Sequence, residues 1–336
     1  MRVRDLSPRR GLQVEVDWGP AYEALVGLVT FAGDEPEASY EVGREWFRAV
    51  RRQASPELVE GLRRLVGRTG WLMISFTAAV RAGPGRTTED LLRRLRAEPA
   101  EAVKQTLLDH ALAEGEKGRD VRRLQATSAA EVKELSLLVL ERWQREVFAG
   151  LEAELLPVLE AQARAWQRQV GRMPALHLVE QATNGIAYEA EPGITKAVLI
   201  PSVLSRPWVL ITENGPEKVF YCPAPADERS DRRLAALYAA LGDPTRLRIL
   251  RRLTGGEAGL TELAEELGLA KSTIHGHLVL LRDAGLVRAL IGARKGYRLA
   301  DTLPGLDRQL AEYLWPTAAA SRSTRRSPER PRPGSR

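Results

Sequence analysis

The sequence predicts an α+β protein that is predominantly helical: a large N-terminal helical domain with a small antiparallel sheet, followed by a smaller C-terminal domain. Three observations support this prediction. Apolar residues recur every three to four positions through most of the chain, which is typical of amphipathic helices. Alternating or continuous apolar runs near residues 12–18 and between 186 and 222 indicate strands. A Pro-, Ala- and charge-rich segment at 221–231 separates two differently patterned regions.

The N-terminal domain, assigned to residues 1–225, takes its predicted strands from both of its ends. LQVEVDW alternates apolar and polar residues, and three more strand-like runs follow much later: IAYEAE, KAVLIP and WVLIT…KVFYC. The last run is expected to be a hairpin turned by Glu213-Asn214-Gly215-Pro216. A long helical stretch covers Ser128 to Val170, and Pro157 should kink or split it. We expect this domain to sense a ligand or to mediate oligomerisation.

Composition excludes several classes of protein. The single cysteine, Cys222, excludes an internal disulfide and any multi-thiolate metal site. The apolar run from Trp71 to Val80 is too short to span a bilayer, and the charged N-terminus does not have the pattern of a signal peptide. We therefore expect a soluble, cytoplasmic protein without a membrane partner.

No catalytic motif is visible in the N-terminal domain. His110 and His177 are isolated, and HExxH, GxSxG and glycine-rich phosphate loops are absent from the sequence. In RAGPGRTTEDLLRRL, Thr88 is more simply a helix N-cap than part of a phosphate loop. Four tryptophans at helical spacing favour a core over an aromatic ligand pocket: Trp46, Trp71, Trp143 and Trp166. We expect no enzyme activity and no cofactor, with a catalytic site hidden from the sequence as the alternative.

The positive charge is concentrated in the C-terminal third. Residues 1–230 sum to −2, whereas residues 231–300 sum to +5 and the last twenty residues to another +5. This distribution favours a polyanionic partner for the C-terminal domain, assigned to residues 231–316. Residues 317–336 lack large apolar side chains and are predicted to be a disordered basic tail.

The C-terminal domain has the pattern of a helix-turn-helix. Asp243 and Pro244 are favoured residues for a helix start, and Leu247, Ile249, Leu250 and Leu253 form its expected buried stripe. A short helix capped by Thr261, a turn at 268–270 and a longer helix from Lys271 to about Ala284 follow. The segment VRALIGARKGYRL then predicts a basic β-hairpin, the wing.

Residues 234–300 resemble the winged helix-turn-helix of the ArsR/SmtB family of bacterial repressors. The resemblance rests on three segments in the same order and at similar separations: LGDPTRLRIL, TELAEELGLAKSTIHGHL and LRDAGLVR. The preceding region is similar to an uncharacterised domain found ahead of such winged helices. The resemblance implies a sequence-specific transcriptional regulator, in most cases a repressor, whose partner is double-stranded DNA. An unknown small-molecule effector would be a second partner.

The resemblance also assigns the residues that read DNA. On the recognition helix, Ile274, Leu278 and Leu281 should face inward and leave the polar residues at its start outward, where they meet base edges. Wing residues would reach the minor groove or phosphates, and a residue of the first helix would contact a phosphate. The assigned residues are Lys271, Ser272, Thr273, His275, Gly276, Arg294, Lys295 and Arg246.

A homodimer is the expected assembly. In the resembling family, the helices that flank the winged helix form the dimer interface. Here the helix before it carries Leu234, Leu237 and Leu241 at helical spacing. The helix after it carries the second apolar stripe: Leu306, Leu310, Tyr313, Leu314 and Trp315. The alternative is a monomer in which the N-terminal domain covers both stripes.

Two departures from the family pattern bear on function. Metal-sensing members carry a Cys-x-Cys pair where this chain has Gly259 and Thr261, and His275 and His277 point to different helix faces, so we expect no metal sensing. The recognition helix begins after Ala270, which lacks a capping side chain. The rival interpretations are an enzyme with a winged-helix appendage and a winged helix that docks on protein. The second predicts an apolar recognition face, whereas this face is polar.

Overall fold

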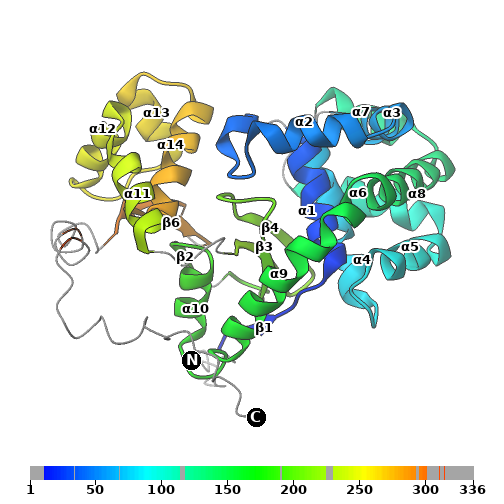
Figure 1. Cartoon of the computed structure of the whole chain (residues 1–336), viewed down its shortest axis with the longest axis horizontal. Helices are drawn as coiled ribbons and strands as arrows, with labels where there is room; N and C mark the ends of the chain where they lie inside the picture. The colour runs from blue at the N-terminus through cyan, green and yellow to red at the C-terminus, as the bar shows by residue number, and fades with distance from the viewer. Residues whose placement is uncertain are drawn as a thin grey trace, which may run out of the picture.

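The computed structural model describes residues 11–33, 35–67, 69–113, 118–189, 191–224, 230–292 and 295–300, together with Leu310 and Leu314. Figure 1 shows two lobes: helices α1 to α9 gather on one side, and α11 to α14 form the other. A sheet lies between them. In the described part of the chain, no helix has the length and apolar character needed to cross a membrane.

The first lobe is helical and is built around α1, whose residues from Ala21 to Thr30 are all buried. Pro20 begins this helix at a position that does not need its missing N–H. Gly27 lets α1 approach α8 closely, because a Cβ there would lie 2.9 Å from the Trp143 ring. The helices of the lobe and the connection to the second lobe are α1 (Pro20–Ala32), α2 (Gly43–Gln53), α3 (Pro56–Leu65), α4 (Thr77–Ala82), α5 (Thr88–Ala97), α6 (Ala100–Ala113), α7 (Arg119–Ala126), α8 (Ala129–Glu146), α9 (Glu152–Gln167) and α10 (Ala175–Ala182).

The sheet beside α1 is mixed, with strand order β1-β3-β5-β4. Its strands are β1 (Gln13–Val16), β3 (Lys196–Ser202), β4 (Leu210–Asn214) and β5 (Glu217–Pro223). The hairpin β4–β5 is antiparallel as predicted, but β1 pairs with β3 and β3 with β5 in parallel. The prediction of an antiparallel sheet is therefore wrong in part. The helices from α1 to α10 form one long crossover between β1 and β3, and such a connection permits parallel pairing.

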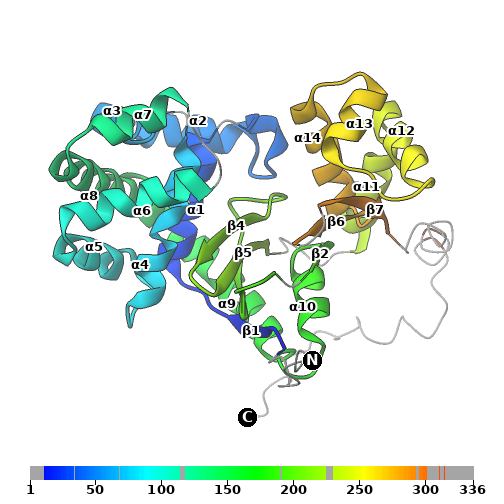
Figure 2. The same ribbon diagram turned by 180° about the vertical axis from the view of Figure 1, so that it is seen from behind.

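The second lobe has the winged-helix order of elements: α11 (Ser230–Leu241), α12 (Pro244–Leu253), α13 (Leu260–Leu267), α14 (Lys271–Asp283), β6 (Val287–Ile291) and β7 (Gly296–Leu299). Its sheet has the order β2-β6-β7, and β2 (Ile186–Tyr188) comes from the IAYEAE run that we expected in the first sheet. β2 pairs in parallel with β6. Figure 2 shows both sheets from behind. The predominantly helical α+β fold with a C-terminal winged helix is confirmed, while the division at residues 225–231 stays a prediction.

Several local predictions are corrected. The 128–170 stretch does not break at Pro157, which lies inside α9; it breaks at Val147, where the turn lets Phe148 become fully buried. The cap of α5 is Thr87, whose hydroxyl accepts the Asp90 N–H at 3.1 Å, and Thr88 is buried behind it. Leu247 lies beside the buried stripe of α12 and is 50% exposed.

The start of α13 is also corrected, because Gly259 and not Thr261 is its N-cap. The Glu262 carboxylate accepts the Gly259 N–H at 3.2 Å, as in a capping box. The helix therefore begins two residues before the position that the sequence indicated, at Leu260.

Candidate nucleic-acid interface

The helix-turn-helix is formed by α13 and α14, joined at Gly268, which has a left-handed backbone (φ 67°). Ile274, Leu278 and Leu281 on α14 are fully buried in the core of the second lobe, as predicted. Asp243 caps α12 by accepting the Thr245 N–H at 2.8 Å. These contacts hold α14 at a defined orientation, so its remaining faces are presented consistently.

One face of α14 is free for a partner. Lys271, Ser272 and Thr273 are exposed at its start, as predicted. With 100° between successive residues, Ser272, Thr273, Gly276 and Leu280 share one side of the helix. Leu280 is 41% exposed there, and a Cβ on Gly276 would meet no atom of the chain within 4 Å. Internal packing therefore does not require a glycine at position 276.

His275 does not lie on this free face, and the prediction that it points outward is wrong. Its ring packs against Trp208 of the first lobe, with centroids 5.3 Å apart. One turn later, Val279 is 5% exposed in a cluster with Tyr40 and Phe47. Burial lowers the pKa of His275 from its usual value, and the nearby Arg282 charge adds to this effect. The sequence could not reveal this burial because the covering residues lie far away in the chain.

Arg246 has contacts within the chain that the sequence did not indicate. Its guanidinium donates to the carbonyl oxygens of Ala240 at 2.6 Å and Ala239 at 2.9 Å at the end of α11, and its phosphate contact stays a prediction. On the wing, Lys295 is exposed, whereas Arg294 lies outside the described residues. Of the predicted residues, the structure thus places Lys271, Ser272 and Thr273 together at the exposed start of α14.

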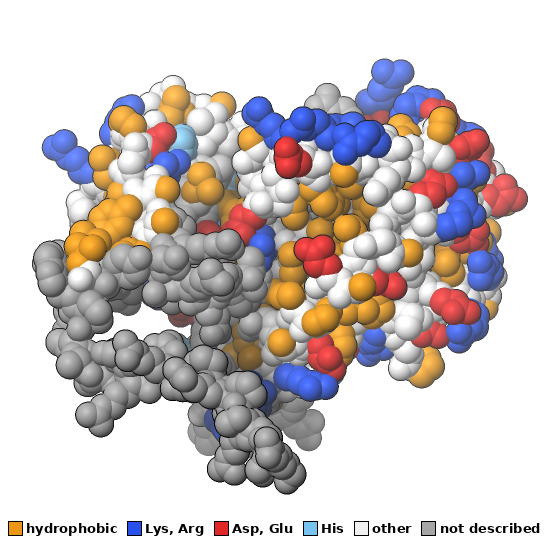
Figure 3. All heavy atoms as spheres, in the orientation of Figure 1, with side chains coloured by type: hydrophobic (Ala, Val, Ile, Leu, Met, Phe, Trp, Pro, Cys, Tyr) orange, Lys and Arg blue, Asp and Glu red, His pale blue; other side chains and the backbone are white. Residues whose placement is uncertain are grey.

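The first lobe adds a basic helix that sequence reasoning missed. Phe47 on α2 contacts the same cluster as Val279 of α14, so the two helices are neighbours. The exposed arginines of α2 are Arg44, Arg48, Arg51 and Arg52. Figure 3 shows Lys and Arg side chains along the edge of the molecule over α2. Their recurrence within one short helix was a visible signal, but its position beside α14 was not.

The described residues contain no cluster of three or more His, Cys, Asp or Glu side chains that could hold a metal ion. Gly259 lies at the N-cap of α13 and Thr261 on its first turn. Cys222 is fully buried in β5, where burial raises the pKa of its thiol well above the usual value. Neither position at α13 supplies a thiolate, and the one thiol is inaccessible.

The four tryptophans do not converge on a pocket. Trp143 and Trp166 are buried, at 0% and 4% exposure, in different hydrophobic clusters. Trp46 and Trp71 pack partly buried against the core, and the His110 ring lies 5.3 Å from that of Trp71. A cavity between the lobes is instead lined by Trp208, which the sequence analysis did not single out.

Comparison with known proteins agrees with this geometry. The profile of a family described as a helix-turn-helix domain matches residues 241–288. The HTH-type transcriptional regulator CmtR of Mycobacterium tuberculosis is 43% identical over 88 residues, which are 26% of this chain and 73% of the relative. The HTH-type transcriptional regulator NmtR of the same organism is 39% identical over 83 residues, 24% of this chain and 67% of the relative. No solved structure gives a significant match.

Proposed function

Because the chain belongs, through its C-terminal winged helix, to the ArsR family of HTH-type transcriptional regulators, we propose that it represses transcription by binding a two-fold operator as a dimer. The observation that carries this proposal is the free polar face at the start of α14. A DNA major groove admits one α-helix, and the first turns of that helix reach base edges. Repression follows if the operator overlaps the promoter.

The residues of the free face of α14 would make different kinds of contact with DNA. The Ser272 and Thr273 hydroxyls can donate to and accept from base edges, while Lys271 supplies a charge for a phosphate. Gly276 permits close backbone approach, since nothing in the chain occupies the space where its Cβ would lie. Lys295 on the wing and the exposed arginines of α2 would add sequence-independent phosphate contacts.

We further propose that the regulator does not sense metal. Support comes from Gly259 and Thr261, which have no ligating side chain of the required kind, and from the burial of Cys222. His275 is also engaged with Trp208. All four histidines and the one cysteine of the sequence lie in the described residues, where no three metal-ligating side chains gather.

The test is a gel shift of the full chain on its own upstream DNA over a series of salt concentrations, together with a reporter gene under that promoter. We expect a specific complex that weakens steeply with salt, and reporter output that rises when the gene is deleted. Zinc, cobalt and chelator should leave the complex unchanged. If no fragment shifts at low salt, the winged helix serves protein docking instead, and the proposal fails.

A further inference from the structure

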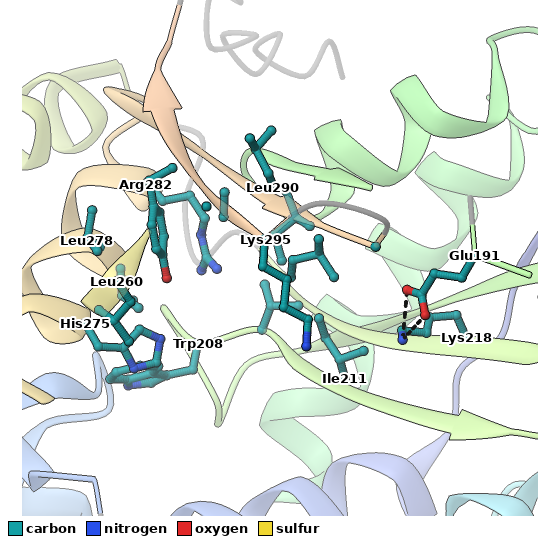
Figure 4. Close-up of a pocket in the computed structure, with 18 of the residues that line it drawn as sticks. Glu191, Trp208, Ile211, Lys218, Leu260, His275, Leu278, Arg282, Leu290 and Lys295 are labelled. Atoms are coloured by element: carbon teal, nitrogen blue, oxygen red, sulfur yellow. Dashed lines mark hydrogen bonds and ion pairs between the residues drawn. The ribbon is translucent and has the colours of Figure 1, made fainter. Parts of the chain in front are cut away.

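A cavity of about 610 Å³ lies between the two lobes. One wall is formed by α14 and the wing, which contribute His275, Arg282 and Lys295. The opposite wall belongs to the β4–β5 hairpin and includes Ile211 and Lys218. Figure 4 shows Arg282 and His275 on one side of the space and Lys218 with Glu191 on the other. The cavity has the size of a small-molecule pocket and lies directly behind the DNA-reading face of α14.

Arg282 is a buried cation with no ion-pair partner in the part of the chain that the structure describes. It is 6% exposed; its Nη2 donates to the Pro207 carbonyl at 2.7 Å, and its Nε has no hydrogen-bond partner among those residues. Among the described residues it forms no ion pair; the adjacent Asp283 carboxylate accepts a hydrogen bond from Asn184, and its charge raises the pKa of Arg282 against the effect of burial. Burial lowers the pKa of the Arg282 guanidinium. A buried charge destabilises the folded state unless an opposite charge or hydrogen-bond partners compensate for its lost hydration.

Two other deeply buried arginine side chains show what is missing at Arg282. Arg81 donates through Nε to the Glu217 carboxylate at 2.6 Å. The Nε of Arg206 lies 3.1 Å from the Glu41 carboxylate. The fold therefore supplies a carboxylate to each of these buried guanidinium groups. No described carboxylate pairs with Arg282 in this way, and its side chain lines the cavity.

The far end of the cavity, around Lys218, has a net negative charge. The Lys218 ammonium lies 3.1 Å from the Glu191 carboxylate and 2.5 Å from that of Glu213. Two carboxylates thus surround one cation, which repels a further anion. Between this end and Arg282 the cavity is lined by apolar side chains, Trp208, Leu278 and Leu290 among them, and by Lys295 of the wing. The cavity therefore has a positively charged end at Arg282 and a net negatively charged end at Lys218.

We propose that this cavity binds a small monocarboxylate with an aromatic or branched apolar body, its carboxylate on Arg282 and its body against Trp208 and Leu278. The Arg282 guanidinium, which has no ion-pair partner among the described residues, matches one carboxylate in a two-point geometry, and Lys295 of the wing adds a second positive charge to the lining. A phosphate dianion would need more donors and would meet the two glutamates. The Tyr297 hydroxyl and the His275 ring also line the cavity and can orient the ligand.

The ligand would be an effector, because it touches both the recognition helix and the first lobe. A ligand held between two parts stabilises the arrangement in which both contact it. Its occupancy would then alter operator affinity through the position of α14. This coupling rests on the proposed function, whereas the binding site itself does not.

The test is titration of the full chain with benzoate, phenylacetate and isovalerate, followed by calorimetry and by tryptophan fluorescence, to which Trp208 contributes. Uncharged phenylacetamide and inorganic phosphate are the comparison ligands. We expect saturable binding of at least one acid at millimolar concentration or below. Arg282→Met should weaken it by about tenfold or more, since a charge-assisted bond is lost. Arg251→Met, which removes an exposed cation of α12, should bind as the unaltered chain does.

Several results would overturn the proposal. The first is that none of the three acids binds saturably at concentrations up to about 10 mM. The second is that phenylacetamide binds as tightly as the acids, and the third is that phosphate binds more tightly than they do. An Arg282→Met variant that binds the acid as tightly as the unaltered chain would also overturn the proposal. If that variant does not fold, Val209→Trp takes its place as the test variant, because the larger side chain fills the cavity from its wall and should abolish binding. Acid binding without any gel shift would keep the site and reject the regulator. A gel shift without acid binding would do the reverse.

Discussion

Glu23 is the most unusual titratable residue in the first lobe. It lies on α1 with 1% exposure, and its Oε1 accepts the N–H groups of Val203 at 2.9 Å and Leu204 at 2.8 Å. Burial raises the pKa of this carboxyl to about 7, although the two backbone donors and Arg206 oppose the shift. The sequence offered no sign of this, because an acidic residue on a helix is most often exposed.

The raised pKa predicts how stability depends on pH. The folded chain holds the Glu23 proton more tightly than the unfolded chain, whose value is near 4.5. The stabilisation is complete below about pH 4.5 and is lost as pH rises towards 7, by on the order of 3 kcal/mol. Glu23→Gln keeps the acceptor oxygen but cannot ionise. We therefore expect urea unfolding to show that the variant gains stability relative to the unaltered chain as pH rises from 5 to 8.

The matched control is Glu60→Gln, because Glu60 is an exposed carboxylate on α3 paired with Arg63. It should follow the pH profile of the unaltered chain across that range. If the stabilities of Glu23→Gln and the unaltered chain changed with pH in parallel, the pKa of Glu23 would not be raised by folding, and the prediction would be wrong.

At the scale of the element, α14 presents three different faces. Ile274 and Leu278 face the core of the second lobe, His275 and Val279 face the first lobe, and Ser272, Thr273 and Gly276 remain free. The inward face followed from helical periodicity in the sequence. The division of the remaining surface depended on the first lobe, so His275 was placed on the wrong side.

This division predicts different roles for neighbouring residues. Thr273→Ala should reduce discrimination between operator and random DNA by about 1–3 kcal/mol, because a base-reading hydroxyl is lost. His275→Ala should leave that ratio unchanged and instead loosen the contact with Trp208. Competition binding measures the ratio, and tryptophan fluorescence follows the contact. If His275→Ala changed base preference and Thr273→Ala did not, the assignment of faces would be reversed.

At the scale of the whole molecule, the lobes are joined more closely than two linked domains. β2 completes the winged-helix sheet, the Arg288 guanidinium lies 2.9 Å from the Glu180 carboxylate, and Arg282 donates to the Pro207 carbonyl. The apolar stripe of α11, which we predicted to form part of a dimer interface, is partly used within the lobe. Leu237 on α11 is 6% exposed because it packs into the core of its own lobe. Leu306, Tyr313 and Trp315 of the second stripe lie outside the described residues.

Dimerisation therefore stays a prediction, and its interface should use the outer side of α11. Tyr238 is 37% exposed there. We expect sedimentation to give twice the chain mass of 37.2 kDa at micromolar concentration, and Tyr238→Glu to shift the equilibrium towards monomer. Val59→Glu, at an exposed apolar residue of α3, is the control and should leave the mass unchanged. A monomeric mass with footprints over a single half-site would exclude the dimer.

The sequence by itself determined the helix-turn-helix, its wing, the Asp243 cap and the inward stripe of α14. These depend on short-range periodicity and capping, which neighbouring residues decide. The tertiary structure decided the parallel pairing of β1 with β3, the transfer of β2 to the second sheet, the burial of His275 and the cavity at Arg282. Each of these brings together residues that are far apart in the chain, so no local pattern could report them. Burial of Arg282 or Glu23 is likewise a property of the neighbours that surround the charge and not of the residue itself.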